Sequence, residues 1–236
     1  MKKGYTLMEI LVTLAIVGVI AALVLPALLA RVGKATIGEG LARGVELVQQ
    51  GTTNIKMEAQ NNSDEGTAFE NLASIRKSDI GLDGNNYITD DNSFYNDTKS
   101  FFAMEDAAYN TGSIRGYDGS NVNENLVSNF TAYKFNKVNV VVAFQNVTNN
   151  NIANAENDDI ISRVLIDANG TAAPNRFGKD VFLFGLTNDG RLIPAGTNKY
   201  HDFDENVAVG ACDGDDIGNG TACAARVASD KWEVKY

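Results

Sequence analysis

The chain begins with residues 1–30, MKKGYTLMEILVTLAIVGVIAALVLPALLA, and this stretch constrains the arrangement of everything after it. No charged side chain occurs from Ile10 to Ala30. A helix of about 20 apolar residues, rising ~1.5 Å per residue, is long enough to cross the hydrocarbon core of a bilayer. The stretch therefore predicts a membrane-spanning helix. Glu9 stands at its very start, and a carboxylate beside lipid is costly, which makes Glu9 a candidate functional residue.

Two ordinary kinds of apolar N-terminus explain this stretch incompletely. A secretory signal peptide has an apolar run of about 7–15 residues. Here the run is longer, and the helical pattern continues past the small residues at Leu25-Pro26-Ala27 where a cleavage could fall. A plain signal anchor accounts for Lys2 and Lys3 through the positive-inside rule. It does not account for the order GYTLME over residues 4–9.

Lys-Gly followed by Tyr-Thr-Leu-Met-Glu and an apolar run containing Pro26 resembles the N-terminus of type IV pilins and secretion pseudopilins. In that family a short basic leader is removed after the glycine, the new N-terminal residue is methylated, and a Glu stands fifth in the mature chain. The resemblance implies cleavage between Gly4 and Tyr5 by prepilin peptidase and methylation of Tyr5. It also implies assembly roles for Glu9 and Pro26. Tyr5 stands where the family usually has Phe, and this departure keeps an aromatic ring.

A helical period continues beyond the apolar run, with apolar positions at steps of three and four. We therefore expect a leader at 1–4 and one long, kinked helix at 5–62, membrane-spanning over about 7–30 and amphipathic over 31–62. The amphipathic stripe is expected to pack on the protein's own sheet, whereas apolar surface nearer the membrane must face lipid or other subunits. The stripe consists of Ile37, Leu41, Val45, Val48, Thr52, Ile55 and Ala59.

Residues 63–236 are expected to form an extracytoplasmic globular head. Two short helices are predicted near Ala68–Lys77 and Lys99–Tyr109, followed by a β-rich region of β-branched and aromatic runs separated by turn residues. Strands joined by such short turns must be antiparallel. The predicted fold class is therefore α+β, with the long helix packed against an antiparallel sheet. The predicted strands are Val138–Val147, Ile160–Asp167, Asp180–Thr187, Arg191–Pro194 after the Asn188-Asp189-Gly190 turn, and Lys231–Tyr236.

Two cysteines, Cys212 and Cys223, lie eleven residues apart near the end of the chain. If the membrane segment places the head outside the cytoplasm, these thiols are expected to pair, two free thiols being the alternative. A disulfide here is similar to the C-terminal disulfide loop of many pilins, and closing such a loop contributes roughly 3 kcal/mol. The enclosed residues 213–220, DGDDIGNG, could offer oxygen ligands to Ca²⁺ as in some pseudopilins. Without the Glu of an EF-hand, an acidic solvated turn is the favoured interpretation.

The composition argues against several other functions. The net charge is −10, and beyond the leader no Lys/Arg cluster predicts a nucleic-acid-binding face. His201 is the single histidine, and the sequence contains no phosphate-binding glycine loop and no nucleophile elbow. We therefore expect no enzymatic activity, no cofactor and no nucleic acid partner.

Together these features predict a prepilin-like structural subunit, stored in the inner membrane as a single-pass protein. Its expected partners are membrane lipid before assembly, prepilin peptidase, the inner-membrane assembly machinery and other pilin subunits in a helical filament. Its final location would be a cell-surface pilus or a periplasmic pseudopilus. The head size and the disulfide loop favour a type IV pilus over the alternative, a pseudopilus of type II secretion. A more distant alternative is a monomeric binding domain for which the helix is only a tether.

Overall fold

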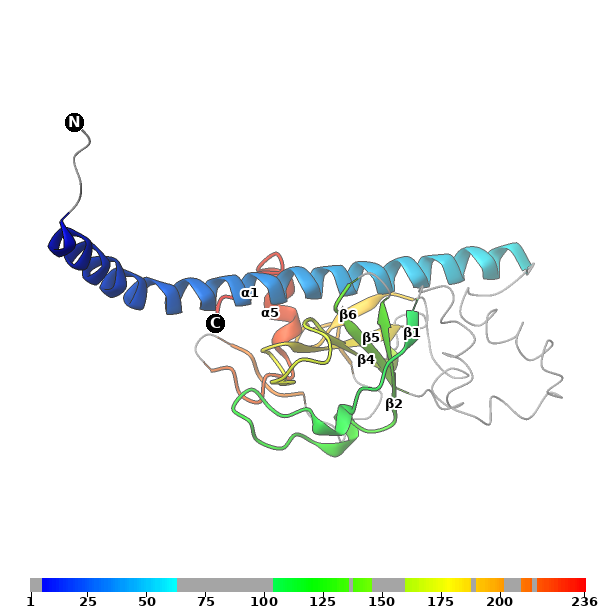
Figure 1. The fold of residues 1–236 in the computed structure, drawn as a ribbon. Helices are drawn as coiled ribbons and strands as arrows, with labels where there is room; N and C mark the ends of the chain where they lie inside the picture. The colour runs from blue at the N-terminus through cyan, green and yellow to red at the C-terminus, as the bar shows by residue number, and fades with distance from the viewer. Residues whose placement is uncertain are drawn as a thin grey trace.

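The computed structural model describes residues 6–62, 104–135, 138–145, 160–187, 190–201, 209–213 and 216–236. One long helix, α1 (Leu7–Asn62), crosses one face of an antiparallel sheet, and its first half extends beyond the head (Figure 1). This arrangement confirms the predicted α+β fold class. The predicted helix at Ala68–Lys77 lies outside the described residues.

The sheet has six strands in the order β1-β2-β3-β4-β5-β6, so each strand pairs with the next strand along the chain. Every pairing is antiparallel. The two central pairings place Val142 opposite Ile166, and Val164 opposite Phe184. The strands are β1 (Met104–Asp106), β2 (Phe130–Phe135), β3 (Val141–Gln145), β4 (Ile160–Asp167), β5 (Val181–Thr187) and β6 (Leu192–Pro194).

Both faces of the sheet are buried, which explains why β3 and β5 are apolar over most of their length rather than alternating. One face packs against the middle of α1 and forms a core with Leu41, Val45 and Val48. The connection between β1 and β2 supplies buried side chains to a second core on the opposite face. That connection contains the short 3₁₀ helices η1 (Thr111–Ser113) and η2 (Glu124–Leu126). The second core includes Ile114, Leu126, Ala132, Val141, Ala143, Leu165, Phe177, Val181 and Leu183.

Glycines let the backbone of α1 approach the sheet closely. A Cβ atom added to Gly44 would stand 2.7 Å from Cγ2 of Ile166, and one added to Gly40 would overlap the carbonyl oxygen of Ala168. Glycine weakens a helix by about 1 kcal/mol relative to alanine. At these positions glycine therefore lowers the helix propensity but allows α1 to pack closely against β4 and the turn that follows it.

The first half of α1 bends away from the line of its second half (Figure 1). Pro26 lies inside the helix in this region. Proline has no N–H to donate to the carbonyl four residues earlier, and its ring crowds that carbonyl, so proline is a common cause of helix bending. The bend carries the apolar segment away from the head.

The predicted helix at Lys99–Tyr109 is wrong over its described part. Met104–Asp106 forms β1 and pairs with β2, placing Met104 opposite Phe135. Met, Glu and Ala favour helices in isolation, but tertiary pairing overrides this weak preference. Here a sheet edge was available, and Met104 is buried in the core beneath α1.

The predicted closing strand at Lys231–Tyr236 is also wrong. The alternation that suggested it is present, because Trp232, Val234 and Tyr236 are half-buried between exposed neighbours. However, Lys231 and Trp232 have positive φ angles of 57° and 67°, which interrupt an extended backbone. The segment packs against the core through its side chains, without pairing as a strand.

A helix and a strand of the head were also not predicted. Helix α5 (Cys223–Ser229) follows the second cysteine, and β2 lies within a region that was expected to contain loops and short helices. The predicted strand at Val138–Val147 begins later, at Val141, because the chain bends at residues 138 and 139, and its last two residues lie outside the described part.

Candidate functional site

The start of α1 is organised by a reciprocal pair of hydrogen bonds between Thr6 and Glu9. The main-chain N–H and the hydroxyl of Thr6 both donate to Oε2 of Glu9, each at 2.9 Å. In return, the main-chain N–H of Glu9 donates to Oγ1 of Thr6 at 3.3 Å. This is a capping box, which satisfies main-chain donors that have no partner within the first turn of a helix. Glu9 therefore fixes the helix start, a role that its position at the membrane edge did not suggest.

The capping box leaves part of the Glu9 carboxylate available. Both bonds from Thr6 end on Oε2, and among the described residues no hydrogen bond reaches Oε1. A carboxylate offers about four acceptor sites on its two oxygens. Glu9 can therefore cap its own helix and accept from an external donor at the same time.

The apolar segment has no cover from the head. Within α1 an 18-residue window reaches a mean hydropathy of 2.8 with none of it buried, so the helix is long and apolar enough to cross a membrane. The polar side chain of Thr13 is satisfied inside the helix, donating to the carbonyls of Glu9 and Ile10 at 2.9 Å. The large exposed apolar side chains include Leu7, Met8, Leu11, Leu14, Val17, Val19, Leu23, Leu25, Leu28, Leu29 and Val32.

The second half of α1 has a different environment. Leu41 and Val48 are fully buried, and Ile37 packs at the edge of the same core. The change from exposed to buried apolar side chains therefore falls between Val32 and Ile37. A continuous exposed apolar surface of this length must be covered by lipid or by other protein.

The far end of the molecule is fastened by a disulfide. Cys212 and Cys223 are joined, with their Cα atoms 5.0 Å apart, so the predicted pairing is present. Cys223 begins α5, and the main-chain N–H of Ala225 in α5 donates to the carbonyl of Ala195, directly after β6, at 3.0 Å. The disulfide thus links the chain at Cys212 to α5, and α5 is hydrogen-bonded to the residue that follows β6.

The acidic loop enclosed by the disulfide is described in part. Asp213 and Asp216 exchange two main-chain hydrogen bonds of 2.8 Å, which close a tight turn, and the two residues between them lie outside the described part. In the part of the chain that the structure describes, no three acidic, cysteine or histidine side chains are placed to hold a metal ion. The acidic solvated turn stays a prediction. His201 is exposed, as expected of a surface residue.

A buried acidic cluster beside β4 and β5 was missed by the sequence analysis. The hydroxyl of Tyr109 donates to Oδ2 of Asp167 at 2.6 Å, and Asp180 accepts from the main-chain N–H groups of Arg176 at 2.7 Å and Asn175 at 3.0 Å. Asp167 and Asp180 are each 1 % exposed. These bonds hold the connection between β4 and β5, so the cluster has a structural role. The sequence signal for this cluster was the presence of Asp167 and Asp180 at the two ends of an Asn/Gly-rich connection.

Burial is the main cause of the pKa shifts in this cluster. It raises the pKa of Asp167 to about 7, with the neighbouring Asp180 adding to the rise and the bond from Tyr109 opposing it. Burial also raises the pKa of Asp180 and, together with the nearby Asp167, that of Tyr109. Removal of water penalises a charged carboxylate, and no described cation offsets that penalty here.

Comparison with known families bears on the N-terminal stretch. Residues 1–25 match the model of the prokaryotic N-terminal methylation motif. The chain carries the type IV pilin and pseudopilin signature. This match confirms the resemblance inferred from Gly4, Tyr5 and Glu9. Comparison with the curated proteins and with the solved structures gives no match.

The predicted site residues occupy opposite ends of the molecule. Glu9 and Pro26 lie on the exposed half of α1, whereas the Cys212–Cys223 disulfide lies in the head. Gly4 and Tyr5 lie outside the described residues. The methylation signature and the exposed apolar helix are consistent with a membrane-anchored precursor.

Proposed function

We propose that this protein is a structural subunit of a type IV pilus-like helical filament, stored in the inner membrane until assembly. The observation that supports the proposal most directly is the exposed apolar half of α1 at the methylation signature. In the membrane this surface faces lipid. In a filament it would face the same surface of neighbouring subunits, because both environments exclude water.

Processing would begin with cleavage between Gly4 and Tyr5, followed by methylation of the new amine on Tyr5. Removal of the leader also removes Lys2 and Lys3, which favour a cytoplasmic location for that end of the helix. The new amine then lies one residue before Thr6, the capping residue of α1. The processed helix therefore carries a cation next to its capped start, in addition to the carboxylate of Glu9.

Glu9 would set the axial register of assembly by accepting from the Tyr5 amine of a neighbouring subunit. The accessible Oε1 of Glu9 supports this role, because it can accept without breaking the bonds to Thr6. At an effective dielectric constant of about 20, unit charges at 4 Å attract by about 4 kcal/mol before desolvation is subtracted. The subunit's task is structural, and we expect it to have no catalytic activity and to need no cofactor.

A pseudopilin of type II secretion is the second candidate, since pseudopilins share the same processing signature. The disulfide of the head and its size favour the pilus subunit. A monomeric anchored binding domain is a third candidate, but a simple tether has no need for Gly4-Tyr5 and Glu9.

Mass spectrometry of the N-terminus in protein isolated from its own cells tests the proposal. We expect a chain that begins at methylated Tyr5, and an intact Met1 would overturn both filament candidates. Deletion of the gene then separates them. Loss of surface filaments with normal protein export is the expected result for a pilus subunit, whereas retained filaments with failed export would assign the protein to secretion.

A further inference from the structure

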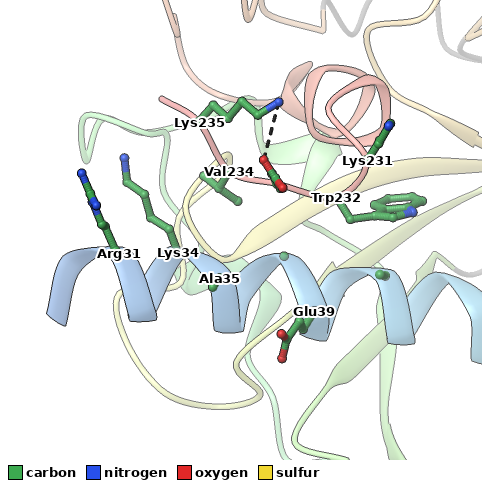
Figure 2. Close-up of a pocket in the computed structure, with 11 residues that line it drawn as sticks. Arg31, Lys34, Ala35, Glu39, Lys231, Trp232, Val234 and Lys235 are labelled. Atoms are coloured by element: carbon green, nitrogen blue, oxygen red, sulfur yellow. Dashed lines mark ion pairs between the residues drawn. The ribbon is translucent and has the colours of Figure 1, made fainter. Parts of the chain in front are cut away.

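A groove lies between α1 and the last described segment of the chain, just beyond the apolar half of the helix (Figure 2). Its volume is about 520 Å³. One wall is the helix from Arg31 to Ala42, and the other is the segment from Lys231 to Lys235. The main-chain carbonyl of Trp232 stands so close to Gly38 that only a glycine fits there. The two walls therefore meet at Gly38 and open toward Arg31.

The groove is positively charged although the chain as a whole is acidic. Four cationic and two anionic side chains line it. Lys235 is already paired, with Asp230 at 3.2 Å and Glu233 at 3.6 Å. The lining residues with charge are Arg31, Lys34, Lys231, Lys235, Glu39 and Glu233.

Arg31, at the open end of the groove, is not paired with any described carboxylate. Arg31 makes no hydrogen bond or ion pair with another described residue, and Lys34 donates to the main-chain oxygen of Tyr236, the last residue of the sequence, at 2.6 Å. Figure 2 shows Arg31 and Lys34 side by side on the helix, both extending from the side of the helix on which Val234 lies. The opening of the groove therefore presents the unpaired guanidinium of Arg31 next to the ammonium group of Lys34, which has further N–H donors besides the one bonded to Tyr236.

The position of these cations along the helix corresponds to the lipid headgroups. The charge-free run Ile10–Ala30 would span roughly 30 Å, which matches the hydrocarbon core of a bilayer. Arg31 and Lys34 follow within the next turn. With the start of α1 at the cytoplasmic surface, both side chains would lie at the outer headgroup layer. Trp232, on the opposite wall, belongs to the residue types enriched at the interface between membrane and water.

We propose that this groove binds the headgroup of an anionic phospholipid while the subunit is stored in the membrane, with Arg31 and Lys34 contacting the phosphate. This inference rests on the proposed membrane-stored state. The guanidinium of Arg31 can bind phosphate oxygens in a bidentate manner, and Lys34 supplies a second charge. Binding would hold the head against the membrane surface, and assembly would require that contact to be released.

Native mass spectrometry of the full chain tests this proposal. The chain, in detergent micelles, is mixed with equal amounts of phosphatidylglycerol and phosphatidylcholine, and the retained lipids are counted. We expect at least fivefold more phosphatidylglycerol than phosphatidylcholine to remain bound. The double variant Arg31→Gln/Lys34→Gln should retain the two lipids about equally. Equal retention by the unaltered chain, or an unchanged preference in the double variant, would overturn the proposal.

Arg43→Gln is the matched control, because Arg43 lies on the same helix three turns further from the membrane and pairs with Glu46 at 2.6 Å. It should keep the lipid preference. Trp232 is the single tryptophan, so its fluorescence reports on the groove directly. In nanodiscs, replacing phosphatidylcholine with phosphatidylglycerol should shift its emission in the unaltered chain and in Arg43→Gln, but not in the double variant. An emission that follows the number of chains per disc instead would assign the groove to a second copy and overturn the lipid proposal.

The lipid-binding proposal and the proposed filament function can fail independently of each other. Processing at Tyr5 and filament formation depend on residues 4–9 and on the exposed apolar surface, and neither is changed in the double variant. If the N-terminus is methylated but the lipid preference is absent, the groove proposal alone fails. If Met1 is intact and the preference is present, the proposed filament function fails while the lipid site remains.

Discussion

Glu9 combines two roles that substitution can separate. Its carboxylate caps α1 through Thr6, and glutamine can make the same capping contact, whereas alanine cannot. We expect Glu9→Gln to retain a stable, membrane-inserted helix but to lose most filament assembly, because an amide has no charge to pair with a neighbouring amine. Glu9→Ala should lose both the cap and assembly. Electron microscopy and immunoblotting of the membrane fraction measure the two effects.

Thr6→Ala provides the reciprocal control for Glu9. This variant removes the hydroxyl that bonds Glu9, a loss worth about 1 kcal/mol of helix stability, but leaves the carboxylate charge in place. Assembly should be reduced far less by Thr6→Ala than by Glu9→Gln. Normal filaments in Glu9→Gln would show that capping, not charge, is what assembly requires of this residue.

Asp167 should make the head less stable as the pH rises, which is the opposite of the usual effect of a carboxylate. Burial raises its pKa to about 7 from the ordinary 3.8, so between these values the folded state binds more protons than the unfolded state. The free energy of unfolding therefore falls as the pH rises from about 4 to 7. The contribution is at most about 4 kcal/mol, since each pH unit is worth ~1.4 kcal/mol. The raised pKa of Asp180 acts in the same direction.

Thermal unfolding between pH 4 and pH 8 measures this effect, with Asp167→Asn as the test variant. Asparagine can still accept from Tyr109 but does not titrate, so the variant should lose most of the decline in melting temperature over this range. Asp118→Asn is the control, because hydrogen bonds from Ser120 lower the pKa of that exposed carboxyl. A decline of equal steepness in Asp167→Asn and the unaltered chain would contradict the assignment.

Among the elements, those whose local signals agree with their tertiary environment were predictable from the sequence. β4 was predicted with its observed bounds, Ile160–Asp167, because a segment rich in β-branched residues is followed by the Asp167-Ala-Asn-Gly170 turn. β5 and β6 were each predicted within one residue at the start and without error at the end. The long helix was visible because its hydrophobic period runs through the glycines that weaken it.

The missed elements depend on contacts that a local pattern does not contain. β1 is a strand because the edge of β2 is available to it, and residues 231–236 alternate because they pack on the core without pairing. Two other elements had usable signals. β2 alternates through FTAYKF, and α5 is an alanine-rich run, CAARVAS, which favours a helix.

The approach of α1 to the sheet leads to a prediction with an internal control. In Gly40→Ala the added methyl group would overlap the carbonyl oxygen of Ala168, so helix and sheet must separate. We expect this variant to lose about 1–3 kcal/mol of stability, as for other overpacked cores. Gly33→Ala places its methyl group in open space on the same helix and should be neutral or stabilising by up to about 1 kcal/mol. Urea unfolding of both variants in detergent measures the difference, and equal stabilities would contradict the close packing.

At the scale of the whole molecule, one helix carries two surfaces with different partners. Its first half has apolar side chains that no part of the described head covers, and its second half completes the head's core. The N-terminal signature was predictable because the methylation motif and the apolar run lie within one continuous stretch of sequence. The groove was not, because its walls are formed by residues 31–42 and 231–235, which only the folded chain brings together.

The division of α1 into an exposed first half and a buried second half predicts how a chain that starts at Arg31 would behave. Its core should be intact, because the first side chain that packs on the core is Ile37 and the buried ones begin at Leu41. We expect its melting temperature to lie within a few degrees of that of the full chain, and we expect a detergent-free monomer by size-exclusion chromatography with light scattering. It should not form filaments, since the surface proposed to join subunits has been removed. Aggregation without detergent would show that the head itself exposes a second adhesive surface, and filaments assembled by the truncated chain would refute the assembly role of residues 7–30.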